Sequence, residues 1–379
     1  MSHDVALLPF SASDAHRATL SGLLLAMYPL GQFLGAPVMG RLSDQYGRKP
    51  VLSVSLFLAA LGFCGMGIAI AFNQFVGLLL CCFLTGLCES NMAIAQSVIA
   101  GHTDQQAELR TKLIGYAYSA ASLGFTLSPL FVGFMMLHWG YSTPCFITAI
   151  GVLLLLAWVI VDFASAQPPL SAQPLRLLQA FSAMKTLVTQ RHLRRFYVIN
   201  FVIFFAVQGL YRVMPIYIFN TWHVTMTTYT FIIAYVSLIC LLSNLLLTGR
   251  LAARFSSRSL LIGLALCGGS AIILMVIPHA FKFIWLTYGL AVIPTVIILA
   301  VSTAWLSQQA TQAEQGQALG NNQSLMVLGE ASSAAFGGTL AAVSVTLPAV
   351  LMGVLLLIVA AIVWYLPQQQ PAVELSFVA

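Results

Sequence analysis

The chain has 379 residues, of which 60% are hydrophobic and only 7% are charged. Soluble domains carry about 25% charged residues, and a folded surface without enough polar cover is not soluble. Lipid must therefore solvate much of this chain. The net charge of +6 comes from only 16 basic residues, which cluster between apolar runs. That pattern argues against nucleic-acid binding.

The apolar residues form eleven runs, each long enough to cross a bilayer as a helix of about 20 residues. We expect helices rather than the strands of a membrane barrel, because the runs are continuous and about twice the length of such strands. In chain order they occupy residues 17–40, 51–72, 75–99, 112–137, 142–163, 195–220, 228–248, 259–278, 282–306, 318–343 and 346–366. The sequence therefore predicts an all-α membrane protein.

The basic residues indicate how these helices are oriented. Thirteen of the 16 lie in or beside the connections 41–50, 100–112, 164–194 and 249–258, which share one side if eleven helices alternate. Arg17 and Lys282 fall on the other side, and Arg212 lies inside a span. By the positive-inside rule the richer side is cytoplasmic. We expect a bacterial inner-membrane protein with residues 1–16 in the periplasm and 367–379 in the cytoplasm.

The longest polar connection divides the chain into two halves. Residues 1–163 are predicted to form an N-terminal bundle of five helices, 164–194 a cytoplasmic linker, and 195–379 a C-terminal bundle of six helices. The linker begins with helix-breaking prolines, and residues 175–188 are predicted to form a short amphipathic helix at the membrane surface.

Two motifs recur in the same order in both halves. Residues 40–49 read GRLSDQYGRK, and residues 249–258 read GRLAARFSSR. The spacing of Gly115, Gly124, Ser128, Pro129 and Gly133 returns 205 residues later at Gly320, Gly329, Ser333, Ala334 and Gly338. Such parallel repeats mark one class of transporter. If the halves match, the first lacks one helix, which should precede residue 17.

The first of these motifs resembles the signature of a known protein family. The segment 40–49 resembles the loop signature of major facilitator transporters, G-x-L-a-D-r-x-G-r-k, which lies between the second and third helices of a twelve-helix fold. Residues 115–133 resemble the fifth-helix signature of the antiporter branch, and residues 308–338 resemble the tenth-to-eleventh-helix region of drug/proton antiporters. The resemblance implies a major facilitator fold with about 11 transmembrane helices in two pseudo-symmetric bundles.

This chain departs from the antiporter pattern at two positions. Cys82 stands where the fourth-helix Arg of the antiporters is expected, and Glu330 replaces a basic residue common in the eleventh helix. The usual proton-relay residues therefore cannot be copied onto this sequence.

Only three ionisable residues lie deep in the predicted spans: Glu89, Arg212 and Glu330. A charge at the bilayer centre costs at least about 2.5–3.5 kcal/mol, so it is expected to face a cavity or a partner. We expect these residues to bind substrate or protons, together with Gln208 and Tyr211 beside Arg212 and Gln96 beyond Glu89. The alternative is a structural ion pair such as Arg212 with Glu330. Tyr28 is one of several aromatic residues that would suit a cavity wall.

The loop motif and the glycine motif have their own predicted roles. In the family the loop latches the two halves in the outward-facing state, which would involve Gly40, Asp44, Gly47, Arg48 and Lys49; the alternative is a topology anchor. Gly40 and Gly47 are expected to permit a tight turn. The set Gly115, Gly124, Pro129 and Gly133 is expected to let helices pack closely.

The predicted function is secondary active transport of a small solute by alternating access, as proton-coupled export. Proton-coupled uptake of a polar metabolite or a siderophore, and a non-transporting membrane receptor or assembly partner, are the alternatives. The sequence shows no catalytic triad, phosphate-binding loop or metal-ligand spacing. We therefore expect no enzymatic activity, no cofactor and no metal. The expected partners are a small-molecule substrate, protons and lipid, but no nucleic acid, and the expected state is a monomer.

Overall fold

The computed structural model describes residues 14–89, 120, 123–124, 127–129, 131–162, 192–277, 280–309 and 315–366. Every regular element within these ranges is a helix. Nine of the helices in the described part are long and apolar enough to cross a membrane, and two shorter apolar ones lie at Phe75–Cys88 and Leu127–Trp139. Each of the eleven predicted runs thus contains a helix, which confirms the all-α membrane fold.

Contacts divide the described residues into two units, one of residues 24–162 and one of residues 14–23 with 192–366. Helix α1 (Asp14–Tyr46) contributes to both. The predicted linker lies largely outside the described residues. The predicted division at 163 and 195 therefore stays a prediction, and each unit is described separately below.

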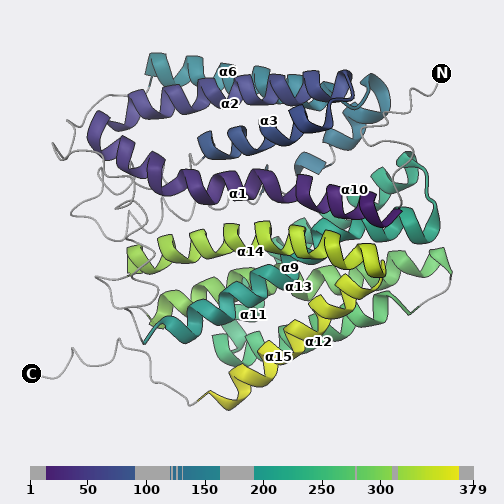
Figure 1. Cartoon of the computed structure of the whole chain (residues 1–379). Helices are drawn as coiled ribbons and strands as arrows, with labels where there is room; N and C mark the ends of the chain where they lie inside the picture. Colours follow the sequence, from purple (N-terminus) through teal and green to yellow (C-terminus); the bar gives the residue numbers. More distant parts are fainter. Residues whose placement is uncertain are drawn as a thin grey trace, which may run out of the picture. The chain divides into compact units, whose positions relative to one another are not determined.

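The first unit is built around α2 (Arg48–Ala71), which packs against α3 (Phe75–Cys88) and α6 (Thr143–Asp162) (Figure 1). Its helices approach closely where glycines remove side chains. A Cβ atom added to Gly31 would lie 2.8 Å from the Leu87 amide nitrogen, and one on Gly86 would lie 3.0 Å from the carbonyl carbon of Tyr28. Gly35, one turn after Gly31, meets Leu87 in the same way. Small residues are how helices pack tightly in lipid, and here they hold α1 against α3.

The second unit contains the C-terminal helices (Figure 1). Helix α9 packs against α14, α15 and α13, and α12 packs against α13 and α15. A large apolar core joins these helices and includes the fully buried Ile203, Leu261 and Leu356. The bounds are α9 (Arg194–Trp222), α10 (Met226–Leu242), α11 (Gly249–Arg254), α12 (Ser257–Met275), η2 (Phe281–Phe283), α13 (Ile284–Gln309), α14 (Gln315–Val343) and α15 (Leu347–Tyr365).

A π-helical turn, η1 (Ser243–Thr248), joins α10 to α11 without a break. The Thr248 hydroxyl donates to the carbonyl oxygen of Ser243, five residues earlier, at 3.3 Å. This turn therefore holds one more residue than an α-helical turn would.

The connection predicted at 41–50 is mostly helical, which corrects the expected loop. Helix α1 continues to Tyr46, α2 begins at Arg48, and Gly40 lies within α1. Gly47 alone breaks the helix, with φ 90° and ψ 156°. A side chain would be strained at that φ, so the sharp change of direction falls on a glycine.

The last basic residue of each copy of the loop motif donates hydrogen bonds to the end of the last described helix of its own unit. Lys49 Nζ donates to the carbonyl oxygen of Ile160, near the end of α6, at 2.9 Å. The corresponding residue 209 positions later is Arg258, whose guanidinium donates to the carbonyl oxygens of Val363 at 3.2 Å, Trp364 at 2.8 Å, and Leu366. The last carbonyls of a helix have no intrahelical partner. Both residues thus supply donors to a helix end.

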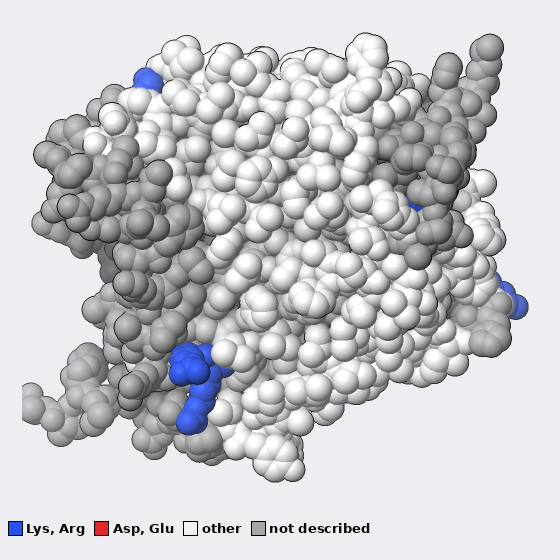
Figure 2. All heavy atoms as spheres, viewed as in Figure 1, with Lys and Arg blue, Asp and Glu red and all other residues white. Residues whose placement is uncertain are grey.

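The surface fits a lipid environment. In Figure 2 the described part of the visible face is almost free of charged side chains, and the few basic residues lie near its margins. Large apolar residues are exposed on several helices, among them Val161 on α6, Leu245 in η1 and Trp364 on α15. A soluble monomer does not expose so much apolar area. The chain is therefore a multi-pass membrane protein.

Candidate functional site

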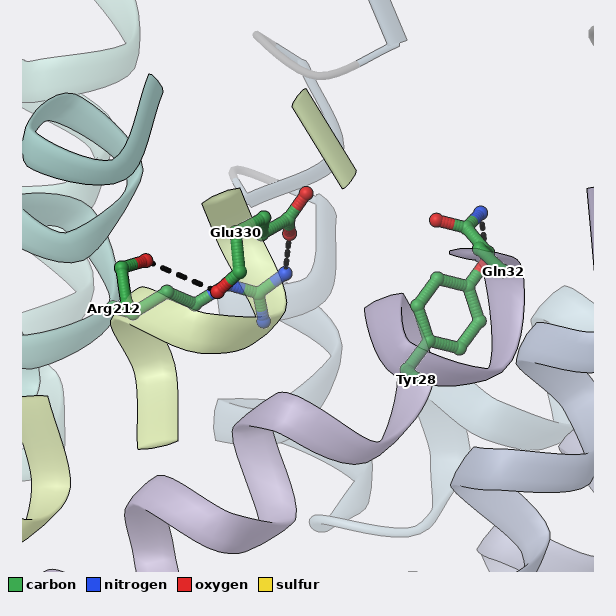
Figure 3. Close-up of polar contacts among 5 residues, drawn as sticks. Tyr28, Gln32, Arg212 and Glu330 are labelled. Atoms are coloured by element: carbon green, nitrogen blue, oxygen red, sulfur yellow. Dashed lines mark hydrogen bonds and ion pairs between the residues drawn. The ribbon is translucent and has the colours of Figure 1, made fainter. Parts of the chain in front are cut away.

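The three deep ionisable residues form two polar clusters, one in each unit. Arg212 on α9 and Glu330 on α14 form an ion pair in the second unit. Glu89 lies at the end of α3 in the first unit, beside α1. Figure 3 shows the Arg212 guanidinium turned toward the Glu330 carboxylate, and it shows Tyr28 and Gln32 one helical turn apart on α1.

Close packing of α9 and α14 positions the ion pair. A Cβ on Gly329 would lie 3.2 Å from the Phe205 amide nitrogen, and one on Gly209 would lie 3.1 Å from the Ser333 Cβ. The Ser333 hydroxyl donates to the backbone carbonyl of Glu330 at 3.0 Å. The side chains of Arg212 and Glu330 are 30% and 15% exposed. A charge left without its partner in such a place costs about 3–5 kcal/mol, so each side chain compensates the charge of the other.

Glu89 has neutral partners instead. The Tyr28 hydroxyl donates to the Glu89 carboxylate. Gln32 Nε2 lies 3.3 Å from the Tyr28 hydroxyl oxygen and 3.4 Å from the Glu89 carbonyl oxygen, at the long end of hydrogen-bond range. Within the described ranges no Lys, Arg or His bonds to Glu89. This carboxylate is therefore half-buried among hydroxyl and amide groups, without a neutralising cation among the described residues.

Helix α3 differs from the predicted span at this point. The run 75–99 is expected to be one helix, but α3 ends at Cys88, and Glu89 follows as its cap residue with φ −91° and ψ 48°. Gly86 in the last turn weakens the helix by about 1 kcal/mol relative to Ala. The end of α3 presents the Glu89 side chain to α1 rather than along a continuous helical stripe. Gln96 lies outside the described residues.

The other residues predicted beside Arg212 have different neighbours. The Tyr211 hydroxyl lies 3.3 Å from the Thr295 hydroxyl on α13, whereas Arg212 contacts α14. Gln208 is half-buried one turn before them. The predicted shared face of α9 therefore divides, with Tyr211 directed toward α13 and Arg212 toward α14.

The predicted latch and glycine motif can be placed only in part. The side chain of Asp44 and the whole of Gly115 lie outside the described part. Arg48 begins α2, while Lys49 bonds within its own unit as described above. Gly133 is buried, Pro129 is half-buried, and a Cβ on Gly124 would meet nothing within 4 Å. The latch and packing roles stay predictions.

Sequence reasoning missed the partners of Glu89 and one buried network. Tyr28 appeared only as one of several aromatic residues, although it shares a helix face with Gln32 at a spacing of four. Asn200 Nδ2 donates to Asn322 Oδ1 at 2.8 Å, and both side chains are 1% exposed. Amides inside apolar runs were the available signal, because polar side chains at such depth form interhelical hydrogen bonds.

Relatives of known sequence include two drug-resistance groups. The class B tetracycline resistance protein of Escherichia coli is 38% identical over 114 residues, which are 30% of this chain and 27% of that protein. The class H protein of Pasteurella multocida is 32% identical over 130 residues, 34% of this chain and 31% of the relative. These alignments span under a third of either relative. Multidrug resistance protein 2 of Bacillus subtilis is 22% identical over 345 residues, 89% of this chain and 84% of that protein.

Solved structures match along nearly the whole chain. The D-xylose-proton symporter has a TM-score of 0.72 at 17% identity, covering 95% of this chain and 90% of the symporter. The human organic anion transporter MFSD10 has a TM-score of 0.69 at 17% identity, covering 93% and 86%. At such identities the likeness shows a shared fold.

A family model completes the assignment. The Major Facilitator Superfamily model matches residues 5–293 and, in a second match, 196–376. These matches cover most of the chain and agree with the helical fold, its apolar spans and the transporter structures that resemble it. The chain therefore belongs to the Major Facilitator Superfamily, and it resembles the drug-efflux branch.

Proposed function

We propose that this chain exports a small amphipathic solute from the cytoplasm in exchange for protons, by alternating access across a bacterial inner membrane. The observation that supports coupling is Glu89, a half-buried carboxylate in an apolar chain with no cation bonded to it in the described residues. A carboxyl group that is alternately protonated and ionised is the simplest means of linking solute movement to a proton gradient.

The direction of transport is supported by likeness to named exporters. Tetracycline resistance proteins and a multidrug resistance protein are among the relatives. Each tetracycline resistance alignment covers under a third of the relative, so tetracycline is a first test compound rather than an assigned substrate. The ion pair of Arg212 and Glu330 adds a charged group that would suit a zwitterionic or ionised solute.

Everted membrane vesicles test this function directly. Vesicles with and without the chain are energised with an inside-acid gradient, and accumulation of tetracycline and of a cationic dye is measured before and after an uncoupler is added. We expect accumulation that requires both the chain and the gradient. Accumulation only in right-side-out vesicles with an outside-acid gradient would indicate uptake instead. A panel of solutes without flux in either preparation would favour the receptor alternative.

A further inference from the structure

We propose that Glu89, Tyr28 and Gln32 form the proton-binding site of this transporter, and that Glu330 does not bind protons during transport. The inference rests on the proposed proton coupling and assigns it to one of the two deep carboxylates. Glu330 lies within an apolar helix and Glu89 lies at the end of one, so their positions in apolar runs do not distinguish them. Their partners do distinguish them, because Glu330 has an ion-pair partner and Glu89 has a neutral hydrogen-bond partner.

Glu330 is paired with a permanent cation. An Arg guanidinium stays protonated throughout the accessible pH range, and Arg212 bonds directly to the Glu330 carboxylate. Protonation of Glu330 would leave the partly buried Arg212 charge without its counter-ion, which is unfavourable. This pair keeps its net charge of zero best when both members remain ionised.

Glu89 can exist in both protonation states without stranding a charge. When the carboxylate is ionised, the Tyr28 hydroxyl donates a hydrogen bond to it. When a proton arrives from water, the carboxyl gains its own O–H, which donates in turn, because the Tyr28 hydroxyl is both donor and acceptor. The Gln32 amide lies within reach of the Tyr28 oxygen and the Glu89 carbonyl, where it orients the hydroxyl. Tyr28 and Gln32 are thus positioning residues for the titrating group.

The other polar groups that the described residues place near Glu89 are also neutral. On α2 the Ser55 hydroxyl donates to the Cys88 carbonyl at 2.9 Å, and on α3 the Thr85 hydroxyl donates to the Cys81 carbonyl at 2.6 Å. The titratable groups that the described residues of α1, α2 and α3 place near Glu89 are the Tyr28 hydroxyl and the Cys88 thiol. Among the described side chains, the Tyr28 hydroxyl is therefore the group that most directly stabilises the ionised form of Glu89.

Infrared difference spectroscopy of the purified protein tests this without knowledge of the solute. A protonated carboxylic acid has its own carbonyl band, which is followed while the pH is raised. We expect wild type to lose such a band on titration, Glu89→Gln to lack it, and Glu330→Gln to retain it. The opposite assignment, with the band absent from Glu330→Gln and present in Glu89→Gln, would overturn the proposal.

The variant Tyr28→Phe gives a more specific test of the role of the hydroxyl. It removes the hydroxyl that stabilises the ionised carboxylate, so the titration midpoint of the Glu89 band should rise by about one pH unit, the effect of one hydrogen bond to a charged group. Tyr229→Phe is the matched control, because its partly buried ring lies on α10 in the other unit, with its centroid 4.9 Å from that of Phe219. We expect no shift of the Glu89 titration midpoint in the Tyr229→Phe variant. An unmoved midpoint in Tyr28→Phe, or an equal shift in both variants, would refute the positioning role.

Vesicle transport separates failure of this site from failure of the proposed function. If wild type accumulates solute with the gradient and Glu89→Gln does so equally well, coupling is real and the site is wrong. If wild type accumulates nothing yet the Glu89 band titrates and shifts in Tyr28→Phe, the site stands and proton-coupled transport of that solute does not. We expect Glu89→Gln to lose gradient-driven accumulation while it retains solute exchange.

Discussion

Replacing Arg258 with Gln should loosen the end of α15. The wild-type guanidinium donates to three carbonyl oxygens at that end, those of Val363, Trp364 and Leu366. Gln is shorter and uncharged, so it cannot span the same three acceptors. The expected effect is local, because the last carbonyls of a helix fray first when they lose their donors.

The size of the effect follows from the bonds lost. A hydrogen bond involving a charged group contributes about 1.5–3 kcal/mol when it is removed singly, and a cation at a helix C-terminus adds about 0.3–1 kcal/mol. The three bonds share one guanidinium at the membrane surface, and water replaces part of them in the variant, so we expect about 2 kcal/mol in total. That corresponds to about a 30-fold rise in the local opening equilibrium.

Amide hydrogen exchange in detergent or nanodiscs measures that equilibrium. The amide of Leu366, which donates to the Ile362 carbonyl at 3.1 Å, is the reporter. Arg254→Gln is the matched control, because Arg254 ends α11 with an exposed side chain for which the described part shows no bonded partner. Lys49→Gln, which removes a single bond at the end of α6, should raise exchange there about fivefold. Equal exchange at Leu366 in the Arg258 and Arg254 variants would show that the Arg258 hydrogen bonds do not stabilise the end of α15.

Three further outcomes are expected. Arg212→Ala and Glu330→Ala should each destabilise the protein by about 3–5 kcal/mol and so lower the yield of folded protein in the membrane. The double variant Arg212→Glu with Glu330→Arg should recover most of that yield. No recovery, measured by quantitative fluorescence-detected chromatography, would exclude a simple ion pair. Gly86→Ala should cost about 1–3 kcal/mol in thermal stability assays because α1 blocks the new methyl group, while Gly151→Ala, with open space around it, should be neutral. Asn200→Leu should cost about 1–3 kcal/mol by leaving buried Asn322 Oδ1 without its donor, and an unchanged melting temperature would count against that network.

Hydropathy was enough to locate the helices but not to fix their ends. Each apolar run is long enough to span lipid, and lipid forces helix on the backbone, so the positions of helices such as α9 and α12 followed from the sequence. The ends did not: the charged segment 41–46 continues α1 into what was expected to be a loop, and α3 ends ten residues or so before its apolar run does. Helix ends depend on caps and glycines more than on apolar content.

The candidate site was half predictable for a related reason. Charged residues inside an apolar run are easily recognised, so Glu89, Arg212 and Glu330 were predicted to be functional. An ion pair between Arg212 and Glu330 was the alternative prediction. Their neutral neighbours were not conspicuous. Tyr28 and Gln32 meet Glu89 because Gly31, Gly35 and Gly86 bring two backbones together, and a single sequence does not say which glycine-lined faces meet.

The π turn between α10 and α11 makes that stretch of chain sensitive to length in an unusual way. Because Ser243–Thr248 carries one residue beyond the α-helical count, removal of one residue there would let ordinary helical hydrogen bonds form throughout. The wide turn accommodates that residue locally, so the shortened segment would keep the face that carries Tyr229 and Tyr235 close to its present orientation relative to Arg250 and Arg254. A one-residue deletion in this turn should thus give a regular helix with its side-chain directions kept, whereas the same deletion elsewhere in α10 would rotate the side chains beyond it by about 100°.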